Sequence, residues 1–166
     1  MIYSLSKRFN NTTYWYMTGV CKAAERFLLN ELEFIKKVEK FAYTDDTSEK
    51  VYNIIRQNVK VYDEDDRLFA LVSPFRPRNP WSSVIGQTTS EGYEINMRRF
   101  VPIAKDFPMW VGNAVHEFCH KPCGYSHPFR KTKTRRLSVP YFLGDQAAAW
   151  ARENIDSLYY TSEKIK

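Results

Sequence analysis

The sequence predicts one domain of the α+β class, because helical patterns fill its first third and strand patterns follow. Its 166 residues, of which 43% are hydrophobic, suffice for one core and are few for two. Helical periodicity dominates residues 1–60, whereas β-rich runs and a further helical pair occupy residues 61–166. We therefore expect residues 1–166 to form a single domain with a mainly helical N-terminal part.

Two helices are expected in the N-terminal part. Apolar residues recur at helical spacing from Tyr16 to about Lys40, which predicts one long amphipathic helix. Asp46, Thr47 and Ser48 are residue types that cap helices, so a second, shorter helix is expected to begin there.

Strand signals follow these helices. The β-rich runs 59–62 and 68–72 flank an acidic turn, which predicts a hairpin. Residues 73–81 contain three prolines, so we expect an irregular surface loop there and no central strand. Residues 82–88 and 92–100 predict two more strands, and the second alternates apolar with polar side chains.

All three histidines of the chain lie close together, at positions 116, 120 and 127. An apolar stripe predicts a helix from about Met109 to Lys121. Positions four apart project from one helical face on successive turns, so His116 and His120 can reach one ion. With Glu117 between them they form an HExxH string, in which two histidines bind zinc and the glutamate is the general base. The competing interpretation is a solvated helical face with two ordinary histidines.

A third ligand is expected after the helix, since catalytic zinc usually has three protein ligands and one open position. Pro122 and Gly124 predict a break at which the chain reverses, and this reversal can bring His127 to the other two histidines. Cys123 is the rival donor, because a thiolate also suits zinc. We prefer His127, because Cys123 lies too close to the helix end to reach back easily.

The run from His116 to His127 resembles the metzincin signature HExxHxxGxxH, and residues 84–158 are similar to small metzincin-like peptidases encoded by phages. The resemblance implies a zincin fold with N-terminal helices, a small mixed twisted sheet, a zinc helix and a closing helix. Residues 85–100 are placed to provide the edge strand that binds extended substrate in this family. The resemblance also implies a zinc-dependent metallopeptidase.

The sequence departs from the family pattern in two places. The glycine and the last histidine both come one residue late after His120, which puts the third ligand in question. Ser138, Val139 and Tyr141 match the turn beneath the metal, but Pro140 replaces its methionine. That methionine is not a ligand, so the second departure concerns packing.

If zinc is the cofactor, the expected reaction is hydrolysis of a peptide bond in a peptide or protein substrate. Glu117 would accept a proton from the attacking water and pass it to the leaving amine. An oxyanion partner is also needed, and the phenol of Tyr141 or Tyr125 can provide it. The resemblance favours Tyr141.

The net charge of +6 is concentrated in the segment Arg130 to Arg136, which holds five cations in seven residues. We expect a solvated loop, an acidic partner, or steering of an acidic substrate toward the metal. The alternative function is a catalytically silent binding module whose basic loop contacts nucleic acid or another polyanion. No nucleic-acid motif is visible, and such a module has no use for Glu117.

The expected location is the cytoplasm, which is the host cytoplasm if the chain is phage-encoded. No run approaches the roughly 18 apolar residues of a membrane span, and the N-terminus lacks a signal-like apolar core. Three cysteines without dense spacing favour a reducing compartment.

Overall fold

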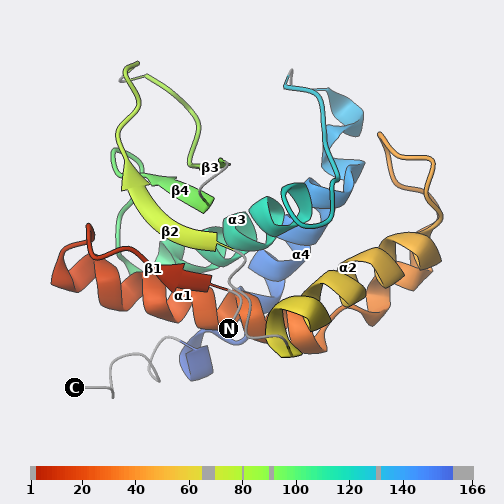
Figure 1. Ribbon diagram of the computed structural model, residues 1–166, viewed down its shortest axis with the longest axis horizontal. Coiled ribbons are helices and arrows are strands. Elements are labelled where there is room, and N and C mark those ends of the chain that lie inside the picture. The colour runs from red at the N-terminus through yellow and green to blue at the C-terminus, as the bar shows by residue number, and fades with distance from the viewer. Residues whose placement is uncertain (1–2, 65–69, 80, 90–91, 130–131, 159–166) are drawn as a thin grey trace.

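The computed structural model describes residues 3–64, 70–79, 81–89, 92–129 and 132–158. They form one α+β domain, as the sequence predicts, with a mixed sheet and several helices (Figure 1). The elements in chain order are β1 (Tyr3–Leu5), α1 (Asn11–Asn30), the 3₁₀ helix η1 (Glu33–Lys37), α2 (Ser48–Glu64), β2 (Ala70–Phe75), β3 (Gly86–Thr88), β4 (Gly92–Asn96), η2 (Ala104–Asp106), α3 (Phe107–His120), η3 (Lys133–Leu137) and α4 (Val139–Glu153).

The sheet has the strand order β1-β2-β4-β3. Strand β2 pairs in parallel with β1 and with β4, whereas β3 runs antiparallel to β4. Strand β3 is therefore an edge strand, and it directly precedes β4 and then α3 in the chain. The N-terminal part of the chain also contributes a strand, β1, so it is less purely helical than predicted.

The long N-terminal helix differs from its prediction at both ends. It begins at Asn11 because the side chain of Asn10 accepts a hydrogen bond from the N–H of Thr13 and caps the helix. It ends at Asn30, and the separate helix η1 follows. This break turns the fully buried side chain of Ile35 into the core, which a continuous helix to Lys40 would not do.

The predicted hairpin within residues 59–72 is wrong, because α2 continues through 59–62 to Glu64. Val51, Ile55 and Val59 are fully buried and four residues apart, so the helical period outweighs the β preference of valine and isoleucine. The start of α2 agrees with prediction, since the hydroxyl of Thr47 accepts from the N–H of Lys50. Residues 63 and 64 of the predicted turn belong to α2, whereas residues 65–69 lie outside the described residues.

The loop predicted for residues 73–81 is wrong at its start, because β2 includes Pro74 and lies between two neighbours. Strand β1 pairs only with residues 70–72 of β2, so Pro74 lies beyond its end. A proline there interrupts no hydrogen bond to β1. The predicted strands at 82–88 and 92–100 are confirmed in shorter form as β3 and β4.

Helix α3 is the central helix of the domain, because it contacts α1, α4 and β3 (Figure 1). Its apolar side chains are buried except for that of Met109, which is exposed, and the phenol of Tyr3 in β1 donates to the carbonyl of Ala114 over 2.9 Å. Among the described residues, no helix combines the length and the apolar composition that crossing a membrane requires.

Candidate metal centre

Helix α3 holds two of the predicted ligands and forms where the apolar stripe predicted it. Pro108 stands in the first turn, where its missing N–H needs no partner. Val111, Ala114 and Val115 have no exposed surface and fix the rotation of the helix in the core. His116 therefore projects from the less buried side of the helix. His120 lies on the same side, one helical turn further along.

The turn after α3 accommodates the extra residue of the sequence. Gly124 has a φ of 73°, the left-handed conformation expected of a glycine at a helix end. The N–H of Gly124 bonds to the carbonyl of His120, and the N–H of Tyr125 bonds to that of Cys119, each over 3.1 Å. The second bond spans one residue more than the outer bond of a Schellman motif. The turn is wider by one residue, and the chain still reverses.

This reversal brings the three histidines together. The Nε2 atoms of His120 and His127 lie 3.1 Å and 3.2 Å from the Nε2 atom of His116. Two nitrogens bound at 2.0–2.1 Å to one tetrahedral zinc ion are about 3.3 Å apart. The three donor atoms all lie within 4.8 Å of one another, and no other group of metal-ligand side chains of this size occurs among the residues described. The spacing fits a zinc ion.

Backbone carbonyl groups orient all three imidazole rings. The Nδ1 atom of His120 lies 2.7 Å from the carbonyl oxygen of Tyr125, and that of His127 lies 3.2 Å from the carbonyl oxygen of Pro128. A backbone hydrogen bond to Pro140 holds His116. A carbonyl only accepts, so Nδ1 carries the proton in His120 and His127, and the Nε2 lone pair faces the shared position. Converging lone pairs repel one another unless a cation lies between them.

The histidines are also in the protonation state that binds metal. Burial, followed by the neighbouring His120 and His127, lowers the pKa of His116 to about 3. Burial likewise lowers the pKa of His120 and of His127. All three imidazoles are therefore neutral near pH 7, and a metal ion need not displace protons from them.

Glu117 lies beside this group with its carboxyl buried. The hydroxyl of Thr88 on the edge strand β3 donates to its Oε2 atom over 2.5 Å. Burial raises the pKa of Glu117 to about 7, while the hydrogen bond from Thr88 acts in the opposite direction. A carboxyl group with this pKa can both take and release a proton near neutral pH. No local pattern indicated a role for Thr88, because its contact with Glu117 is long-range.

Tyr141 is the tyrosine that lies beside the histidines. Its ring centre is 4.6 Å from that of His116 and 4.7 Å from that of His127. Burial raises the pKa of its phenol, and the charge of Arg135 opposes this shift. The phenol of Tyr125, the alternative candidate, instead donates to a carboxylate oxygen of Asp46. The backbone carbonyl of Tyr125, and not its phenol, accepts the hydrogen bond from His120.

Cys123, the rival third donor, does not belong to the group of potential ligands. Its side chain is buried in the core, and burial strongly raises the pKa of its thiol, so no thiolate is present near neutral pH. Among the described residues, His127 is therefore the third donor that the geometry provides.

Two glycines that sequence reasoning missed set the position of α4 under the site. A Cβ atom on Gly112 would overlap the carbonyl oxygen of Gly144 and lie 2.9 Å from the Cβ of Ala148. One on Gly144 would lie 2.9 Å from the carbonyl oxygen of Gly112 and 3.2 Å from the Cβ of His116. The backbones of α3 and α4 thus touch one turn before His116, and this contact brings Tyr141 to the histidines.

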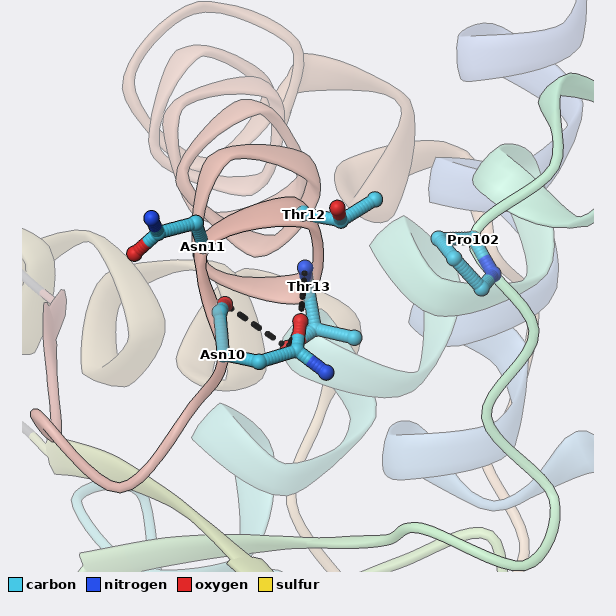
Figure 2. A pocket seen from close by; sticks show the side chains of 5 residues that line it. All are labelled: Asn10, Asn11, Thr12, Thr13 and Pro102. Atoms are coloured by element: carbon cyan, nitrogen blue, oxygen red, sulfur yellow. Dashed lines mark hydrogen bonds between the residues drawn. The ribbon is translucent and has the colours of Figure 1, made fainter.

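A hollow of the surface lies elsewhere, at the start of α1, and has a structural explanation. Figure 2 shows the side chains that line it: Asn10, Asn11, Thr12, Thr13 and Pro102. The side chain of Asn10 accepts from both the N–H and the hydroxyl of Thr13, which is the helix cap already described. No acidic, basic or thiol side chain lines the hollow, so the histidine group remains the candidate site.

Comparisons with protein families, with curated proteins and with solved structures find no match for this chain.

Proposed function

We propose that the protein is a zinc-dependent, metzincin-like metallopeptidase whose zinc ligands are His116, His120 and His127. The observation that supports this most strongly is the convergence of three Nε2 atoms at the spacing of zinc ligands. Glu117 supplies the second element of a peptidase site, because it follows His116 on α3 and lies buried beside the group.

Bound zinc would polarise a substrate carbonyl and lower the pKa of a water molecule toward 7. Glu117, oriented by Thr88, accepts a proton from the attacking water and transfers it to the leaving amine. The phenol of Tyr141 donates a hydrogen bond to the carbonyl oxygen as negative charge develops there. Among the described strands, β3 has a neighbour on one side only, so an extended peptide can pair with its free edge.

The alternative function, a silent module that binds a polyanion, does not account for Glu117. A carboxyl group is costly to bury, and here Thr88 holds it in one orientation next to the histidines. The proposal includes a reducing, cytoplasmic location, which the free and buried state of Cys21, Cys119 and Cys123 supports.

The test is hydrolysis of fluorescently labelled casein by the zinc-loaded protein and by its Glu117→Gln variant. The variant keeps all three histidines, so its zinc content should equal that of the wild type while hydrolysis falls at least about a hundredfold. Glu94→Gln is the matched control, because Glu94 lies on β4 and bonds to Gln87, outside the histidine group. Unchanged hydrolysis in Glu117→Gln, or loss of its zinc, would contradict the assignment.

A further inference from the structure

Arg135 differs from the other described cations of the basic loop. Arg130 and Lys131 lie outside the described residues, and Lys133 and Arg136 point into solvent. Arg135 is half-buried, and its guanidinium carbon lies 4.4 Å from the ring centre of Tyr141. One cation of the loop is therefore directed toward the histidine group.

The positive charge of Arg135 has no counter-charge within the part of the chain that the structure describes. Glu117 and Asp145 are the carboxyl groups that act on neighbouring Tyr141, and neither forms an ion pair with Arg135. One Nη1 donor bonds to the carbonyl of Phe129 over 3.2 Å, and the guanidinium also forms a hydrogen bond with the phenol of Tyr141. Among the described residues, the buried Nε–H has no acceptor. A guanidinium that pairs with no carboxylate favours binding of an anion from outside the chain.

The position of Arg135 relative to the histidines limits where that anion can lie. The guanidinium carbon lies 4.4 Å from the ring centre of Tyr141, and this centre lies 4.6 Å from that of His116 and 4.7 Å from that of His127. The charge of Arg135 also acts on both histidines. An extended peptide advances about 3.4 Å per residue. A group held by Arg135 is thus within about three residues of a bond positioned at the histidines.

We propose that Arg135 binds a carboxylate of the substrate, so that the site selects peptides with an acidic group within about three residues of the cleaved bond. The guanidinium presents paired N–H donors that match the two oxygens of a carboxylate. An acidic side chain or a free C-terminus can supply this group. The inference rests on the proposed peptidase function and adds a specificity-determining residue to it.

A purely structural role for Arg135 makes a different prediction. Its guanidinium lies over the ring of Tyr141, and its bond to Phe129 helps to hold the loop, so its loss could weaken the binding of every ligand equally. A carboxylate anchor instead discriminates between ligands that differ only in one charge. The test therefore compares matched ligands as well as protein variants.

The experiment measures binding of peptide hydroxamates to the zinc-loaded full chain by calorimetry. Ligand pairs carry Glu or Gln at the first, second or third position from the hydroxamate, and a further pair carries a free C-terminal carboxylate or a carboxamide. We expect the carboxylate to tighten binding at least tenfold in one pair, and the identity of that pair distinguishes a side chain from a C-terminus. Arg135→Met, which keeps an apolar stem over Tyr141, should abolish the difference, whereas the exposed control Arg136→Ala should retain it.

Three results would overturn the inference. The first is equal binding of both members of every pair by the wild type. The second is a preference for the carboxylate that survives in Arg135→Met. The third is an equal loss of this preference in Arg136→Ala, which would indicate general steering by charge. The wild-type comparison holds even if the variant fails to fold. Absence of any hydroxamate binding would overturn the proposed function together with the inference, whereas binding without discrimination would overturn the inference alone.

Discussion

The contact between α3 and α4 at Gly112 and Gly144 should control both stability and metal affinity. An added Cβ on Gly112 overlaps a backbone carbonyl of Gly144, which cannot move without displacing α4. Overpacking of this kind costs about 1–3 kcal/mol, and the higher helix propensity of alanine returns at most about 1 kcal/mol. We expect Gly112→Ala to lower the free energy of unfolding by about 2 kcal/mol and Gly144→Ala by about 1 kcal/mol.

Gly144→Ala should lower the zinc affinity more than Gly112→Ala does, although it destabilises the fold less. The reason is that its new methyl group would lie 3.2 Å from the Cβ of His116. Displacement of a ligand by its surroundings lowers metal affinity by about tenfold or more. Urea unfolding of the zinc-free protein gives the stability, and competition with a chelator gives the zinc affinity. The control is Gln146→Ala, an exposed position on α4 that should change neither quantity appreciably.

Wild-type stability and wild-type zinc affinity in both glycine variants would refute this reasoning. That result would mean that the helices do not touch at these backbones and that α4 does not set the position of His116.

Three further predictions concern the surroundings of the histidines. Thr88→Val removes a hydrogen bond to the Glu117 carboxylate and should lower kcat by about tenfold with zinc content unchanged, whereas Thr88→Ser should retain the rate. Burial lowers the pKa of His116 to about 3, so between about pH 6.5 and that value the unfolded chain binds more protons than the folded one. The zinc-free protein should therefore lose stability as the pH falls through this window. His116→Gln should reduce the slope of the free energy of unfolding in urea against pH. Both proteins are measured in a Glu117→Gln background. Tyr125→Phe removes the bond to Asp46 and should slightly lower the thermal midpoint, with zinc affinity unchanged because the backbone carbonyl of Tyr125 remains.

The sequence predicted the part of the site that depends on local geometry. Spacing alone placed His116 and His120 on one helical face, and Pro122 with Gly124 indicated the reversal that returns His127. Local patterns do not report which residues of distant segments meet. Thr88, Gly112 and Gly144 acquire their roles from neighbours that lie far away in the chain. The role of Arg135 depends on a loop conformation that no local pattern indicated.

Prediction of the fold failed where local preferences conflicted with packing. The β-branched residues near the end of α2 suggested a strand, but burial of one helical stripe decided the structure. Pro74 suggested a loop, but the short β1 leaves that part of β2 without a neighbour on one side. The residues around Pro74 do not indicate how long the neighbouring strand is. The α+β class depended on the order of segments, and it was predicted correctly.

The metal centre is tested most directly by the zinc content of the purified protein. Elemental analysis after loading and dialysis would measure this content for the wild type, His127→Ala and Cys123→Ala. A site of three histidines should hold equimolar zinc in the wild type and in Cys123→Ala, and His127→Ala should lower the zinc affinity at least about tenfold. Wild-type zinc affinity in His127→Ala, or loss of zinc only in Cys123→Ala, would contradict the three-histidine site.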